Sequence, residues 1–204
     1  TMELDKALAD IADIRSRIAA ETLFQGFGPA VIAASGLLAL AGATAQVQWP
    51  GLAATPEAFL GVWIGIAAVA AALIGVEMIA RSRRRHGGLS SAMIVNAIAQ
   101  FLPSGFAGAV LAAVLLRYAP QDVWMLPGLW LILVALGLFA ASRSLPRAVI
   151  LPAGWYFVSG TAVLIAASGD QALSPWTMGL PFGFGQLLMA GVLHFAEEGG
   201  RGER

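Results

Sequence analysis

The sequence predicts an all-α polytopic membrane protein: six transmembrane helices arranged as three hairpins, preceded by an amphipathic cytoplasmic helix. Three observations lead to this prediction, namely the composition, the apolar runs and the placement of the cationic residues. Of the 204 residues, 58% are hydrophobic and 12% are charged. An ordinary soluble domain is about 45–50% apolar and about 25% charged, so lipid is the expected solvent for most of this chain.

Apolar runs of the length that crosses about 30 Å of hydrocarbon, roughly 20 residues, recur along the chain. We place the six predicted spans at residues 27–47, 57–80, 90–116, 123–142, 147–168 and 174–196. The predicted domains are a cytoplasmic helix at 1–24, a six-helix transmembrane domain at 25–197 and a cytoplasmic tail at 198–204. Glycine is frequent within the spans, as expected where small residues let membrane helices pack closely.

The cationic residues predict the orientation. With a cytoplasmic N-terminus, eleven of the 12 Lys and Arg residues lie on the cytoplasmic side, and only Arg117 lies outside, in agreement with the positive-inside rule. Trp49, Tyr118, Trp124 and Trp176 then fall near the outer interface, where aromatic belts form. Assuming a bacterial source from the Ala, Gly and Arg richness, we expect a multi-pass inner-membrane protein with both termini in the cytoplasm.

A Ser-Gly pair recurs in each odd-numbered span, followed by two prolines. The pairs are Ser35-Gly36, Ser104-Gly105 and Ser159-Gly160; the prolines expected in the loops are Pro50, Pro120 and Pro175, and those expected to open the next span are Pro56, Pro127 and Pro181. One interpretation is a pseudo-threefold bundle around a shared central site. The other is the ordinary use of Ser, Gly and Pro at membrane-helix contacts and starts. The sequence leaves both open.

Residues 2–22 form a predicted amphipathic helix with a narrow apolar stripe. The stripe consists of Leu4, Ala7, Leu8, Ile11, Ile14 and Ile18. Its steps of three and four favour helix-to-helix contact over lipid, and its polar face mixes acids with bases, which suits anionic lipid poorly. The helix therefore packs on the protein's own cytoplasmic loops, pairs with a second copy as a homodimer, or binds a cytosolic protein.

The cytoplasmic loop after the second span is strongly basic. Its cations are Arg81, Arg83, Arg84 and Arg85. They set the topology or bind acidic lipid headgroups, each cation contributing about 1 kcal/mol near an anionic surface. Nucleic-acid binding is not expected, because no aromatic residues lie between the arginines. Glu77 precedes Arg81 by one helical turn, and is either its ion-pair partner or a proton-coupling candidate.

Amides within the spans suggest a polar site at mid-membrane. Asn96 and Gln100 lie one turn apart on the face that also carries Ser104, and Gln186 in the sixth span reaches a similar depth. These four residues either line a cavity for a neutral or amphipathic small molecule, or hold helices together as interhelical hydrogen bonds. Pro103 cannot donate to the carbonyl of Ala99, so we expect a local bend there.

No catalytic or metal-binding motif stands out. The chain has no Cys and two histidines, His86 and His194, so we expect no cofactor and no metal. Glycines at 183 and 185 are interpreted as close-packing positions beside Phe182 and Phe184. A lipid-active enzyme would depend on Glu77, His194, Glu197 and Glu198.

The sequence favours a non-enzymatic membrane protein. We expect a small-ligand sensor or membrane anchor that acts through its N-terminal helix on a partner or a second copy. The alternative is a small-solute transporter or channel with a polar midplane site.

Overall fold

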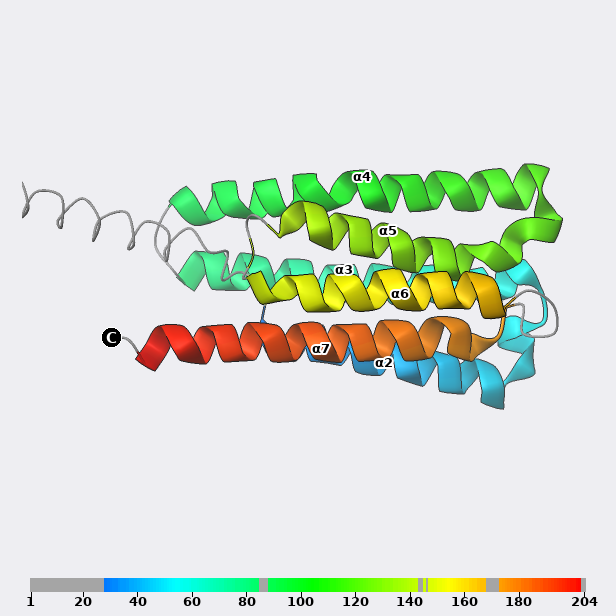
Figure 1. The fold of residues 1–204 in the computed structure, drawn as a ribbon, viewed down its shortest axis with the longest axis horizontal. Coiled ribbons are helices and arrows are strands. Elements are labelled where there is room, and N and C mark those ends of the chain that lie inside the picture. Colours follow the sequence, from blue (N-terminus) through cyan, green and yellow to red (C-terminus); the bar gives the residue numbers. More distant parts are fainter. Residues whose placement is uncertain (1–27, 85–87, 143–144, 146, 168–172, 203–204) are drawn as a thin grey trace, which may run out of the picture.

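The structure, a computed structural model, describes residues 28–84, 88–142, 145, 147–167 and 173–202, and side chains within these ranges except at 81–84, 88–98, 100, 197 and 199–202. These residues form a bundle of α-helices (Figure 1), which confirms the predicted all-α class. The long helices are α2 (Pro29–Gln48), α3 (Pro56–Arg84), α4 (Gly88–Tyr118), α5 (Leu126–Ala141), α6 (Ile150–Ala166) and α7 (Pro175–Gly202). Three short 3-10 helices are η1 (Pro50–Ala53), η2 (Pro120–Met125) and η3 (Arg147–Val149).

Among the described residues, six segments are long and apolar enough to cross a membrane, as predicted. They are Pro29–Gln48, Pro56–Ala80, Phe101–Tyr118, Pro120–Ala141, Arg147–Ala166 and Pro175–Ala196. Their bounds follow the predicted ones within a few residues wherever the side chains are described, and the third lies in a helix that runs from Gly88 to Tyr118, close to the predicted 90–116. Helix α7 runs on to Gly202, past the predicted domain boundary at 197. The architecture is that of a multi-pass membrane protein.

Prolines begin several helices, because the first turn needs no donor from their missing N–H. Pro29, Pro56 and Pro175 are the first residues of α2, α3 and α7. Pro181 was expected to open the last span, and this was wrong, since it lies inside α7. The helix already starts at Pro175, and membrane helices tolerate an interior proline where neighbouring groups satisfy the freed carbonyl.

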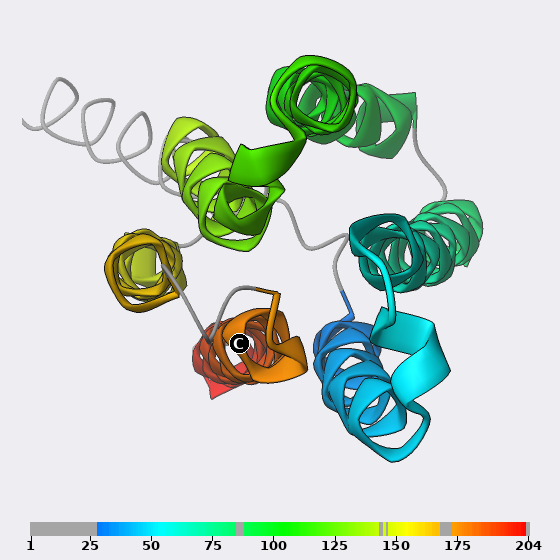
Figure 2. The same ribbon diagram turned by 90° about the vertical axis from the view of Figure 1, so that its right-hand side faces the viewer.

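Seen along its long axis, the bundle is a ring of helices in the order α3, α2, α7, α6, α5 and α4 (Figure 2). The most extensive contacts join α2 to α7 and α5 to α6. Both of these pairs link different predicted hairpins. The pair α3 and α4 has the least contact of any neighbours in the ring, so packing between hairpins is uneven around it.

Two glycine pairs lie at close helix crossings. A Cβ on Gly36 would lie 2.9 Å from the carbonyl oxygen of Gly183, and a Cβ on Gly183 would lie 3.3 Å from that of Gly36. Between α5 and α6 the same relation joins Gly128 and Gly160, at 2.8 Å in each direction. Gly105 has no atom within 4 Å of such a Cβ. The Ser-Gly pairs of α2 and α6 thus sit at tight crossings, and that of α4 does not.

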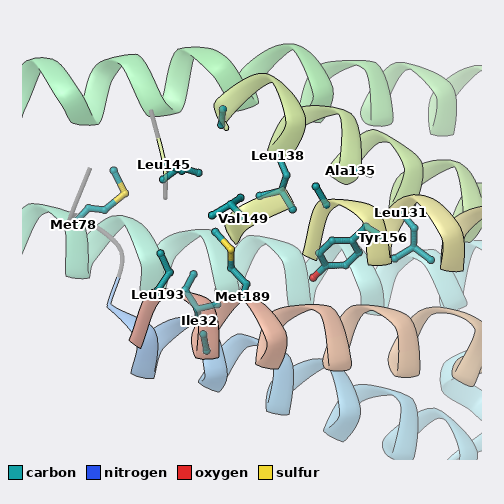
Figure 3. Packing of buried hydrophobic residues seen from close by; sticks show 13 residues of the cluster. Ile32, Met78, Leu131, Ala135, Leu138, Leu145, Val149, Tyr156, Met189 and Leu193 are labelled. Atoms are coloured by element: carbon teal, nitrogen blue, oxygen red, sulfur yellow. The ribbon is translucent and has the colours of Figure 1, made fainter. Parts of the chain in front are cut away.

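Apart from Ser35 and Gln46, the buried side chains among the described residues are mainly apolar. Toward the end at which α7 finishes, a buried cluster draws on α2, α3, α5, α6 and α7 (Figure 3), including Ile32, Met78, Leu138, Tyr156 and Leu193. Toward the opposite end a second cluster includes Phe59, Leu60, Trp63, Leu126 and Met178. Large apolar side chains also cover the outside: Val76, Leu102 and Phe106 are 67%, 66% and 71% exposed. Apolar outer faces of this kind suit contact with lipid.

Aromatic side chains gather at one end of the bundle, which we call the tryptophan end. Trp49 follows α2, Tyr118 ends α4, Trp124 lies in η2 and Trp176 lies in the first turn of α7. All but Trp124, which is half-buried, are exposed, and the guanidinium of Arg117 lies 5.7 Å from the Tyr118 ring centroid. This placement matches the aromatic belt expected at one interface.

Candidate functional site

The predicted polar site draws on two separate parts of the ring. Asn96 and Gln100 lie in α4, with side chains outside the described set. Ser104 faces α5, since a Cβ on Gly137 would lie 3.2 Å from its hydroxyl. Gln186 lies on α7 against α2, with its Cβ 2.9 Å from a Cβ built on Gly36.

Helices α4 and α7 are not neighbours in the ring (Figure 2). Ser104 therefore belongs to the contact between α4 and α5, and Gln186 to the contact between α2 and α7. The shared cavity remains a prediction. The side-chain amide of Gln186 makes no hydrogen bond among the residues that the structure describes. The side chain is half-buried.

The other predicted residues lie mainly at the end opposite the tryptophans. Glu77 is half-buried near the end of α3, with Arg81 one turn further on; the side chains of Arg81, Arg83 and Arg84 are outside the described set. Arg85 and His86 lie outside the described residues, as does the N-terminal stripe of Leu4, Leu8, Ile11, Ile14 and Ile18.

His194 and Glu198 form an exposed pair on α7. Their Nε2 and Oε1 atoms are 3.4 Å apart, and the side chains are 58% and 56% exposed. No group of three or more His, Cys, Asp or Glu side chains suited to a metal occurs among the residues described.

Aromatic side chains make the interhelical hydrogen bonds at mid-bundle. Trp155 Nε1 donates to the carbonyl of Pro181 at 2.8 Å, and its ring centroid is 4.5 Å from that of Phe184. The hydroxyl of Tyr156 donates to the carbonyl of Phe182 at 3.3 Å. The Tyr156 ring contacts the position that a Cβ on Gly185 would take. Gly183 and Gly185 are thus close-packing positions, as the sequence indicated.

Trp130 makes a similar bond between α5 and α4. Its Nε1 donates to the carbonyl of Gly108 at 3.0 Å. Such bonds in membrane proteins contribute about 0.6 kcal/mol on average, so these three aromatic donors mainly fix which helix faces meet.

Gln46, which sequence reasoning passed over, is the most buried amide among the described side chains. It is 2% exposed, and its Nε2 donates to the carbonyls of Leu52 at 3.1 Å and Phe59 at 3.3 Å. The side chain thereby ties the end of α2 to η1 and to the first turn of α3. Its Oε1 and Nε1 of Trp63 are both buried, and neither has a hydrogen-bond partner among the described residues. A buried polar atom left unbonded costs about 1–3 kcal/mol.

Comparison of the chain with family models, with curated proteins and with solved structures finds no match. The class that the fold defines is a multi-pass membrane protein built on six helices that can cross a bilayer.

Proposed function

We propose that this chain is a non-enzymatic membrane module that anchors a partner, or passes a signal to it, through the segment that precedes α2. The observation that carries the proposal is the packing at the start of α2. Gly28 is buried. Ile32 is 5% exposed and belongs to a buried cluster that also includes Met78 and Leu193 (Figure 3). A helix joined to α2 at this point would be attached to the packed interior at that end of the bundle.

This attachment gives a physical route for signalling. Close-packed interiors transmit displacement because side chains have few alternative positions. A ligand or partner that shifts residues 2–22 would move the first turn of α2 against α3 and α7. A change in helix packing within the membrane would reach the N-terminal helix by the same contacts.

The cellular location is part of the proposal. The excess of cations at one side supports a bacterial inner-membrane protein with both termini in the cytoplasm. The N-terminal helix would then meet a cytosolic protein or a second copy of the chain. Its stripe of Leu4, Ile11, Ile14 and Ile18 supports a helical partner.

Removing residues 2–22 tests the proposal. We expect the truncated protein to insert into the membrane and to unfold thermally as the full chain does. It should lose its dimer, as measured by its mass in detergent, or its partner, as measured by pull-down. Two full-length variants sharpen the test: Ile14→Gln on the apolar stripe should weaken association, and Ser16→Gln off the stripe should not. Association that survives both the truncation and Ile14→Gln would refute the proposal.

A transporter or channel is the second candidate, favoured by the half-buried Gln186, whose side-chain amide is unbonded among the described residues. The apolar filling of the ring interior weighs against an open path. A flux assay on reconstituted vesicles decides between the two candidates. Solute flux that falls in Gln100→Leu and Gln186→Leu would favour transport, and vesicles without flux in the unaltered protein would exclude it for the solutes tested.

A further inference from the structure

The two unbonded polar atoms near the tryptophan end have complementary chemistry. Oε1 of Gln46 can only accept a hydrogen bond, and Nε1 of Trp63 can only donate one. Both side chains are nearly inaccessible, at 2% and 3% exposed, and within the part of the chain that the structure describes neither buried atom has a hydrogen-bond partner.

The two side chains belong to the contact between the end of α2 and the first two turns of α3. Gln46 Nε2 lies 3.3 Å from the carbonyl of Phe59, and Trp63 is one turn beyond Phe59, with ring centroids 6.2 Å apart. Ala43 precedes Gln46 by three residues, on the same side of α2. A Cβ on Gly179 would contact Ala43 and lie 3.6 Å from Cη2 of Trp63. The Trp63 indole therefore packs beside the stretch of α2 that carries Ala43 and, one turn further on, Gln46.

We propose that this junction binds a water molecule, which accepts the N–H of Trp63 and donates to Oε1 of Gln46. The ligand must both donate and accept, and the burial of the two atoms limits it to a very small molecule. The side chains around them are apolar, among them Phe59, Leu60 and Met178, which disfavours an ion. Buried waters are held by two to four polar partners in this way.

The water would complete the hydrogen bonding of the Gln46 amide. Nε2 already joins the end of α2 to the carbonyls of Leu52 and Phe59, and the water would join Oε1 to Trp63. Helix α2 would then be connected to η1 and to two successive turns of α3. This inference concerns the tryptophan end and does not depend on the proposed role of the N-terminal helix.

The test is solution NMR of the full chain with 15N-labelled tryptophan in perdeuterated detergent. The six Trp indole signals are assigned from single Trp→Phe variants, and water contact is read from cross-relaxation with the indole protons. We expect a water signal at Trp63. Trp130 and Trp155 are internal controls without one, because their indoles donate to carbonyls at 3.0 and 2.8 Å. The proposal would be overturned if the Trp63 indole showed no contact with water. It would also be overturned if the indole instead showed contact with protonated lipid added to the sample.

Variants at Gln46 test the shared ligand. Gln46→Met should abolish the water signal or shift the Trp63 indole resonance, and Gln46→Asn, which keeps an amide but withdraws it by one methylene, should shift it in a folded protein. Gln48→Met is the matched control on the same helix, where the side chain is exposed, and should leave Trp63 unchanged. A Trp63 signal that keeps its position and its water contact in both Gln46 variants would show that the amide takes no part.

Discussion

Gly36 and Gly183 bring α2 and α7 so close that each backbone occupies the space of the other's missing side chain. A Cβ on Gly36 would lie 2.9 Å from the carbonyl oxygen of Gly183, and the reverse distance is 3.3 Å. Close approach through small residues is the usual way in which membrane helices gain packing energy. It makes the glycines of this bundle the most direct test of its packing.

Gly183→Ala should destabilise the protein. The new methyl would lie 2.7 Å from Cγ of Leu40 and 3.3 Å from the carbonyl oxygen of Gly36, and overpacking of this kind typically costs about 1–3 kcal/mol. Thermal unfolding in detergent, followed by intrinsic fluorescence, measures the change. Gly191→Ala on the same helix is the control, because nothing lies within 4 Å of its Cβ; it should leave the midpoint unchanged or raise it. Equal midpoints for the two variants would contradict the α2–α7 crossing.

Gly160→Ala tests the crossing between α5 and α6 independently. Its methyl would lie 2.8 Å from the carbonyl oxygen of Gly128 and 3.0 Å from Cβ of Leu131, so backbone must move to admit it. We expect a loss of about 1–3 kcal/mol in unfolding free energy. Gly154→Ala, in the same helix with open space at its Cβ, should show no such loss. If Gly154→Ala proves the more harmful of the two, the helix pairing is wrong.

Trp155→Phe should weaken the contact of α6 with α7. The change removes the donor to the carbonyl of Pro181 and alters the ring contact with Phe184, for an expected loss of about 1 kcal/mol. Trp176→Phe serves as the control, since that indole is 40% exposed at the tryptophan end. Chemical unfolding of both variants in one detergent gives the comparison. A Trp155→Phe protein as stable as the Trp176→Phe protein would argue against this hydrogen bond.

The orientation can be measured with single cysteines, because the chain contains none. Gln121→Cys in η2 and Ala148→Cys in η3 replace exposed residues at opposite ends of the bundle. With the cationic side inward, a membrane-impermeant maleimide should label the cysteine at 121 in intact cells. The cysteine at 148 should react only after the membrane is permeabilised. The reverse pattern would overturn the orientation drawn from Lys and Arg.

For the amides of the candidate polar site, the sequence predicts depth in the membrane but not the neighbouring residues. The depth of Gln186 follows from counting residues along a helix, but its neighbour Gly36 lies 150 residues away in the chain. Gln46 lies near the end of the predicted span 27–47, where an amide is expected to face the interface. In the structure its side chain is buried and donates to the carbonyl oxygen of Phe59 in α3.

The number of helices, their approximate ends and the positions of their aromatic residues were determined by the sequence itself. These depend on the length and polarity of single segments, because each segment must match the thickness and polarity of the bilayer on its own. The pairing of α2 with α7 and of α5 with α6, and the burial of Gln46 beside Trp63, were decided by the tertiary structure. Packing between helices depends on the shapes of two faces together, and the periodicity of one helix carries no information about which distant face will fit it.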